Sequence, residues 1–366
     1  MCVGAVAVVA GCHAGGTLGD GGSGTLSGIG GRATGGRGGG PFVGEGTGGA
    51  GPITGTAGAS WDFCGQTPPP AERLPSRIVF VLDTSASMND AADGSCTGGC
   101  GSGSKWSAAV GGIDSVVGAD GVPVEWGLKF IGAGGDTCDT GPIDVATAPR
   151  NGNAVMDAVR ARTAAAQLAV PGNTPTRAAI SAATSHLMGA TSPATVAMLL
   201  LTDGLPDCVP GAADSRLPDV PNTLQAIQFA TTAGIPTFVL GIGALDFGVD
   251  DVLSTMAAAG GTARGGTPGY YRVATAAEVI GAINEVIRTI GSCTFVIPPP
   301  PTTDGTTSRG DISVVGDSMY IVQDANNGWT YTDNTLTSVT LHGMACDAVR
   351  AGTISQVRIV FRCPLI

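Results

Sequence analysis

Residues with side-chain oxygen atoms gather at three places in the chain. Asp83, Ser85 and Ser87 form the pattern D-x-S-x-S, Thr174 lies in a Gly-rich turn, and Asp203 lies within the letters T-D-G. Carboxylates and hydroxyls suit a hard cation such as Mg2+, with Mn2+ or Ca2+ as alternatives. Two carboxylates neutralise the charge of such a cation, and neutral hydroxyls leave it open to one more carboxylate. The sequence therefore predicts a divalent metal site.

Two buried strands must position the two carboxylates. Residues 77–83 and 196–202 are near-continuous apolar runs, each leading into one of the acids, which is typical of strands in a parallel sheet. Helical and strand patterns alternate along the rest of residues 74–291, which predicts a doubly wound, mostly parallel α/β sheet flanked by helices. We expect further strands at 124–131 and 236–241, and helices at 104–117, 152–166, 176–188, 222–233, 249–259 and from the Thr275-x-x-Glu278 capping box onward.

Ligands of open α/β sheets bind beyond the carboxyl ends of the strands, where these polar residues are expected to lie. The three pieces, in this order, resemble the von Willebrand factor A (VWA) domain family over residues 74–291. That family's metal-ion-dependent adhesion site (MIDAS) has D-x-S-x-S, a distant Thr, and an Asp commonly within T-D-G. Thr174 matches better than Thr176 because the family's Thr follows a Gly-rich turn. Thr176 is instead a candidate helix N-cap.

The resemblance implies a role for each residue of the site. Ser85 and Ser87 are expected to bind the metal directly. Thr174 is expected to bind it directly or through water, depending on state. Asp83 and Asp203 are expected to act mostly through water and hydrogen bonds.

The amino terminus has the character of an export signal. Residues 1–11 include a short run of small apolar residues, and Val9-Ala10-Gly11-Cys12 resembles a bacterial lipobox, in which Cys12 would carry the lipid. The alternative is a truncated ordinary signal with an incidental cysteine. Residues 12–73 are rich in Gly, Ser, Thr and Pro, which predicts a flexible tether. We therefore expect an extracytoplasmic lipoprotein of the bacterial envelope, at the outer membrane or cell surface, held to the membrane by its lipid alone.

Ten cysteines favour an oxidising compartment. The pairs Cys138–Cys208 and Cys96–Cys100 are candidates for a disulfide-braced rim around the metal, although they could also only stabilise loops. A zinc site at Cys96-x3-Cys100 is poorly supported because no second close pair follows. Residues 292–366 contain short β-prone pieces and predict a small β-rich module stapled by disulfides, with Cys346–Cys363 as the first choice.

Charge and composition restrict the function. A net charge of -11 argues against a nucleic-acid partner. With three histidines and no evident base or nucleophile beside the metal residues, we expect a binding module rather than an enzyme such as a metal-assisted hydrolase. The expected function is metal-dependent capture of a protein partner's Asp or Glu. A structural envelope protein whose metal site only stabilises the fold, or binds nothing, is the alternative.

Overall fold

The computed structural model describes residues 68–118, 124–132, 138–164, 173–189, 194–212, 214, 217–243, 247–300 and 309–362. All of them belong to one unit of the chain, residues 53–366. The predicted export signal, Cys12 and residues 12–67 of the predicted tether lie outside the described residues. Within the described residues, no helix is long and apolar enough to cross a membrane.

A six-stranded sheet with the order β3-β2-β1-β4-β5-β6 forms the centre of the fold. All neighbouring strands are parallel except β2 and β3, which pair antiparallel. This order reverses between β1 and β4, which is the point where ligands bind in doubly wound sheets. The strands are β1 (Ser76–Asp83), β2 (Val124–Ile131), β3 (Val145–Ala148), β4 (Thr195–Thr202), β5 (Thr237–Ile242) and β6 (Tyr271–Val273).

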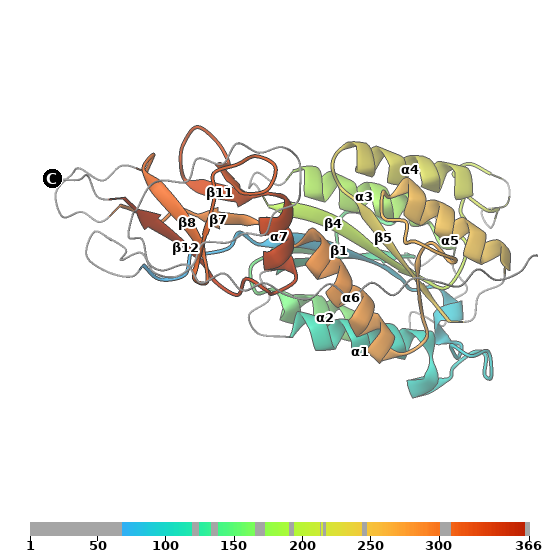
Figure 1. Ribbon diagram of the computed structural model, residues 1–366. Helices are drawn as coiled ribbons and strands as arrows, with labels where there is room; N and C mark the ends of the chain where they lie inside the picture. Colours follow the sequence, from blue (N-terminus) through green and yellow to red (C-terminus); the bar gives the residue numbers. More distant parts are fainter. Residues whose placement is uncertain are drawn as a thin grey trace, which may run out of the picture. The chain divides into compact units, whose positions relative to one another are not determined.

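Helices cover both faces of this sheet (Figure 1), which confirms the predicted doubly wound α/β fold. Ile78, Phe80 and Leu82 of β1 point into one core, and Val79 and Val81 point into the other. This explains why the run is apolar without alternation. The first core packs against α1 (Lys105–Val117), α2 (Gly152–Ala164) and α6 (Ala276–Ile290), and the second against α3 (Thr176–Met188), α4 (Val220–Thr232) and α5 (Phe247–Ala259).

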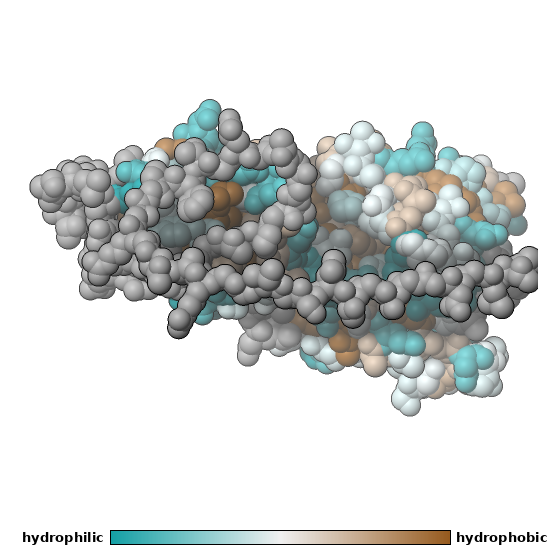
Figure 2. Space-filling model, in the orientation of Figure 1, coloured by the Kyte–Doolittle hydropathy of each residue, from teal (hydrophilic) through white to brown (hydrophobic). Residues whose placement is uncertain are grey.

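Some large apolar side chains of the described residues remain exposed. Met188 of α3 and Phe229 of α4 are examples. Figure 2 shows hydrophobic and hydrophilic residues interspersed over the region of α4 and α5. Scattered exposed apolar residues are normal in soluble proteins, so we assign these no role.

Two small antiparallel sheets, β10-β11-β7 and β12-β8-β9, follow α6. They confirm the β-rich character predicted for this part, but it also contains a helix that the sequence did not predict, α7. Only Ala345, Cys346 and Val349 of this helix are buried, which is too short a pattern to separate a helix from a turn. The elements are β7 (Thr294–Val296), β8 (Ile312–Gly316), β9 (Met319–Ile321), β10 (Trp329–Tyr331), β11 (Ser338–Leu341), α7 (Gly343–Arg350) and β12 (Val357–Phe361).

Three disulfides connect described cysteines. Cys96–Cys100 and Cys138–Cys208 are the pairs that the sequence suggested. The pairing of Cys346 with Cys363 is wrong, because Cys346 is bonded to Cys293, with the two Cα atoms 5.5 Å apart. The unpredicted α7 places Cys346 against the start of β7, within the distance that a disulfide requires. Cys363 lies outside the described residues.

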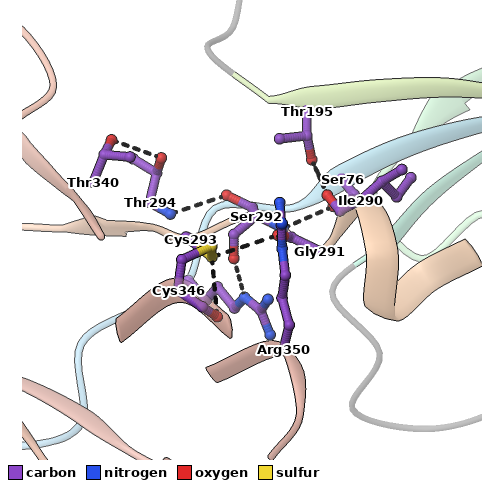
Figure 3. The surroundings of a disulfide bond; sticks show 11 residues. Ser76, Thr195, Ile290, Gly291, Ser292, Cys293, Thr294, Thr340, Cys346 and Arg350 are labelled. Carbon is purple, nitrogen blue, oxygen red and sulfur yellow. Dashed lines mark hydrogen bonds between the residues drawn. A yellow bond between two sulfur atoms is a disulfide. The ribbon is translucent and has the colours of Figure 1, made fainter. Parts of the chain in front are cut away.

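The end of α6 is fixed to the amino ends of β1 and β4 (Figure 3). The Ile290 carbonyl accepts hydrogen bonds from Ser76 Oγ at 3.3 Å and Thr195 Oγ1 at 2.8 Å, and Arg350 Nε donates to the Gly291 carbonyl at 3.0 Å. The disulfide follows within two residues of Gly291. This network joins the central sheet to the carboxyl-terminal sheets.

The predicted tether ends earlier than residue 73. Ala71 N donates to the carbonyl of Val357 in β12 at 2.7 Å, and Leu74 N donates to the carbonyl of Thr294 in β7 at 2.8 Å. Residues 71–73 are therefore part of the folded unit. The Pro-rich composition of this stretch is typical of a linker, but an extended segment can still pair through its backbone. This pairing therefore had no signal in the sequence.

Candidate metal centre

The carboxyl ends of β1 and β4 bring the two predicted carboxylates together. The strands pair in parallel, with Leu82 opposite Leu201, so Asp83 and Asp203 leave the same edge of the sheet. Thr202 Oγ1 donates a hydrogen bond to Asp83 Oδ2 at 2.6 Å. The last residue of β4 therefore fixes the carboxylate at the end of β1.

The loop after β1 folds its two serines over these acids. Ser85 N donates to Asp83 Oδ1 at 2.8 Å, and the one-turn helix η1 (Ala86–Asn89) begins after Ser85. The hydroxyls of Ser85 and Ser87 lie 3.1 Å apart. Both point to Asp203 Oδ1, at 3.5 Å from Ser85 Oγ and 3.0 Å from Ser87 Oγ. Four of the five predicted residues thus form one hydrogen-bonded cluster.

The two carboxylates of the cluster are buried, and the two hydroxyls lie on its solvent side. Asp83 is 1% exposed and Asp203 is 7% exposed. Ser85 is half-buried, and Ser87 is exposed. A ligand from solvent would therefore meet the hydroxyl oxygens first, with both carboxylates beneath them.

The electrostatics of the cluster favour additional positive charge. Burial, together with the negative charge of Asp203, raises the pKa of Asp83 to about 6, although hydrogen bonds from Thr202 and Ser85 oppose the shift. A raised carboxyl pKa means that the ionised form is insufficiently stabilised. A divalent cation at the serine hydroxyls would supply that stabilisation.

Thr174 lies in the turn before α3 and is buried. Its carbonyl accepts a hydrogen bond from Asp207 N at 3.1 Å, and its own N–H donates to the Asp207 carboxylate. The turn is therefore fixed to the loop that follows Asp203. Within the described part of the chain, however, the Thr174 hydroxyl makes no hydrogen bond to the other four residues of the site.

Thr176 is not the N-cap of α3. Pro175 holds that position, and Thr176 is the first helical residue, with its hydroxyl 3.3 Å from the Thr174 carbonyl. The capping interpretation failed because the turn is closed by its own backbone, in which Thr176 N donates to the Thr174 carbonyl at 2.7 Å.

One important residue of the site was missed by sequence reasoning. Lys105, the first residue of α1, places its Nζ 2.8 Å from Asp203 Oδ2, and the two side chains are 12% and 1% exposed. The chain has only two lysines, at 105 and 129. The position of one of them at the start of a helix beside the predicted metal loop was the available signal.

The loop after Asp203 is braced by one of the two predicted disulfides. Cys208 forms the disulfide with Cys138, and Asn173 Nδ2 lies 3.2 Å from Cys208 Sγ. Cys208 directly follows Asp207, which holds the Thr174 turn. The disulfide, the turn and the Asp203 loop therefore form one connected support beside the predicted metal residues.

The donor set fits a small hard cation. Among the described residues, no group of three or more His, Cys, Asp or Glu residues could hold a metal. A metal at this edge would depend on the hydroxyls of Ser85 and Ser87 and on two carboxylates. Such an oxygen-only set suits Mg2+, which keeps several waters, better than Zn2+, which prefers nitrogen and sulfur.

No protein-family model and no curated protein matches the chain. Among solved structures, the chain is similar to the SpaC pilus adhesin of Lactobacillus rhamnosus GG, with a TM-score of 0.43 and 17% identity over 79% of this chain and 39% of the adhesin. It is also similar to the VWA domain of SpRpn10, with a TM-score of 0.37 and 13% identity over 58% and 95% of the two chains.

A third similar structure is proximal thread matrix protein 1 from the mussel byssus, solved with a zinc-occupied MIDAS motif. Its TM-score is 0.38, with 13% identity over 62% of this chain and 51% of that one. This chain therefore spans about half or less of the adhesin and of the thread protein. Because these TM-scores are below 0.5, we rest no argument on them, and the fold class stands on the sheet order and the flanking helices.

Proposed function

We propose that this protein is a VWA-type binding module that captures an acidic side chain of a protein partner through a divalent cation, Mg2+ in the first instance. The observation that carries the proposal is the cluster at the carboxyl ends of β1 and β4. Two buried carboxylates lie beneath two accessible serine hydroxyls at the point where the strand order reverses.

Each residue of the cluster has a role in this proposal. Ser85 and Ser87 offer their hydroxyl oxygens to the cation, and Thr174 offers its hydroxyl from the neighbouring turn. Asp83 and Asp203 orient those hydroxyls and waters and balance the charge. When bound, the cation supplies the positive charge that attracts a partner's Asp or Glu. Thr202 and Asp207 position Asp83 and Thr174 through their hydrogen bonds.

We also propose an extracytoplasmic location, with a lipid on Cys12 as the only membrane anchor. The support in the folded unit is its three disulfides, because such bonds persist in oxidising compartments. A partner on the cell envelope or on a neighbouring cell is consistent with that location.

A purely binding role agrees with the position of the described histidines. His186 Nε2 accepts a hydrogen bond from Thr147 N at 3.0 Å, and His342 Nε2 lies 2.7 Å from Thr330 Oγ1. Both are therefore engaged in other parts of the fold. The alternative function, a structural protein whose metal only stabilises the fold, uses the same cluster but requires no partner.

The decisive experiment immobilises the full chain, incubates it with envelope extract in Mg2+ or in EDTA, and compares wild type with Ser85→Ala. Ser115→Ala, an exposed serine of α1, is the matched control. We expect partners that bind wild type and Ser115→Ala in Mg2+ but not in EDTA. The same partners should not bind Ser85→Ala in either condition. Binding that survives both EDTA and Ser85→Ala would contradict the mechanism. Calorimetric Mg2+ binding without a Mg2+-dependent partner would favour the structural alternative.

A further inference from the structure

Lys105 is held at the metal cluster from both ends of its side chain. Its backbone N–H donates to the Asp90 carbonyl at 2.9 Å, and its Nζ lies 2.8 Å from Asp203 Oδ2. The stem between these points passes Gly243, where a Cβ would lie 2.9 Å from Lys105 Cε. Gly243 also has a φ of +97°, which favours glycine. The fold therefore provides a fitted path for this lysine.

The ion pair changes the charge balance of the cluster. Asp203 Oδ1 is taken by the two serine hydroxyls, and Oδ2 is taken by Lys105. Asp83 and Asp203 carry two negative charges and Lys105 carries one positive charge, so the cluster has one net negative charge. A divalent cation would reverse this to one net positive charge, and a partner's carboxylate would then neutralise it.

A cluster without the lysine would behave differently. Its two carboxylates would be neutralised by the divalent cation alone, and a partner's carboxylate would add a net negative charge. Because like charges repel strongly in a partly buried site, Lys105 should weaken the binding of the cation and strengthen the binding of the carboxylate.

We propose that Lys105 is a specificity-determining residue that lowers the affinity of the site for the metal and raises the affinity of the metal-loaded site for an acidic ligand. This inference rests on the proposed function. The charge of Lys105 makes the ternary complex of protein, cation and carboxylate electrically neutral. The lysine thereby couples ligand capture to cation binding.

The test compares full-length wild type with Lys105→Met, which keeps most of the stem and removes the charge, and with Lys105→Arg, which keeps the charge. Arg160→Met is the matched control, since it removes one positive charge from an exposed ion pair between Arg160 of α2 and Asp114 of α1. Mg2+ affinity is measured by calorimetric titration. Ligand affinity is measured with glutarate, a simple dicarboxylate, in saturating Mg2+.

We expect Lys105→Met to bind Mg2+ about tenfold more tightly and glutarate about tenfold more weakly than wild type, and Lys105→Arg and Arg160→Met to resemble wild type. Lys105→Gln provides a second neutral variant if the methionine variant does not fold, as judged by circular dichroism. Equal Mg2+ and glutarate affinities in wild type and the neutral variants would overturn the inference while leaving the proposed function intact.

Two other outcomes separate the inference from the proposed function. Mg2+ binding by Lys105→Met but not by wild type would support the role of the lysine and contradict metal-dependent capture in the native chain. No Mg2+ binding by any folded variant would overturn both.

Discussion

Hydroxyl side chains serve different purposes at the two ends of the central sheet. At the amino end, Ser76 and Thr195 donate their hydroxyl protons to the Ile290 carbonyl. At the carboxyl end, Ser85 and Ser87 lie against the carboxylate of Asp203. A hydroxyl that donates to a buried carbonyl fixes two pieces of chain together. A hydroxyl that donates to a carboxylate and faces solvent keeps its oxygen available to a cation.

The charged residues differ in the same way. At the amino end, Arg73 and Arg350 donate to backbone carbonyls beside the end of α6, and burial and the charge of Arg350 lower the pKa of Arg73. At the carboxyl end, Lys105 pairs with Asp203, and burial raises the pKa of Asp83. These two arginines at the amino end are thus satisfied by carbonyl dipoles, while the two acids at the carboxyl end have one lysine beside them. Only the second condition favours a metal.

The largest expected effect concerns stability at the amino end. The Cys293→Ser, Cys346→Ser double variant opens a loop of 53 residues, which should reduce the free energy of unfolding by about 4 kcal/mol. Urea unfolding followed by circular dichroism measures this change. The Mg2+ affinity of the folded variant should stay within about twofold of wild type, because the bond lies at the far end of the strands. A large loss of Mg2+ affinity would show that the two ends are coupled.

The next effect concerns the metal at the carboxyl end. Asp83→Asn removes one of the two acids that we propose balance the cation, and it should lower Mg2+ affinity about 100-fold. The amide retains the shape of the carboxylate and can still accept a hydrogen bond from Thr202. Calorimetric titration measures the affinity, and a thermal melt in EDTA checks the fold. Unchanged Mg2+ affinity would place the metal elsewhere.

A third effect is the pH dependence that Asp83 gives to the carboxyl end. Asp83 must be ionised to support a cation, and its pKa in the folded protein is about 6, above the ordinary value of 3.8. Mg2+ affinity should therefore be nearly constant above pH 6 and fall about tenfold for each pH unit below it. The stability of the metal-free protein should change in the opposite direction and rise as the pH falls below 6. The ionised Asp83 destabilises its fold above pH 6, and this penalty is lost as the pH falls toward 3.8.

Titrations of Mg2+ at pH 5, 6, 7 and 8 check the first trend, and thermal melts in EDTA over the same range check the second. Asp83→Asn should remove the contribution of this group from the melts. A wild-type Mg2+ affinity that does not change between pH 5 and 8 would show that Asp83 does not support the cation.

The strand ends that hold the site were accessible to sequence reasoning because burial on both faces leaves a plain apolar run. Phe80 and Leu82 enter one core and Val81 the other, so no polar residue lies between Arg77 and Asp83 in β1. The capping box at Thr275 was equally local, and its reciprocal hydrogen bonds are present. Patterns settled within a few residues could therefore be predicted.

The features that escaped prediction depend on residues distant in the chain. Lys105 reaches Asp203 across 98 positions, and Cys346 reaches Cys293 through a helix of eight residues. The strands β3 and β6 have only four and three residues, which is too few for a periodic signal. In each case the contact or the strand depends on the packed fold rather than on neighbouring residues in the sequence.

The smallest expected effects give the most direct comparison of the two ends. Ser76→Ala removes a hydroxyl that donates to the Ile290 carbonyl at 3.3 Å and accepts from Ser292 N at 3.2 Å, and leaves the buried Ser292 N–H without this partner. It should reduce the free energy of unfolding by about 1–2 kcal/mol and leave Mg2+ affinity unchanged. Ser87→Ala removes an exposed hydroxyl and should change metal-free stability by less than about 0.5 kcal/mol.

Mg2+ binding should show the reverse order. Ser87→Ala should weaken it about tenfold, because the cation loses one of its hydroxyl oxygens, whereas Ser76 lies at the opposite end of β1. Urea unfolding in EDTA and calorimetric titration, performed on both variants, give the four values needed. If Ser87→Ala lowered stability as much as Ser76→Ala and left Mg2+ affinity unchanged, the hydroxyls at both ends would serve only to fix the chain, and the distinction between the two ends would fail.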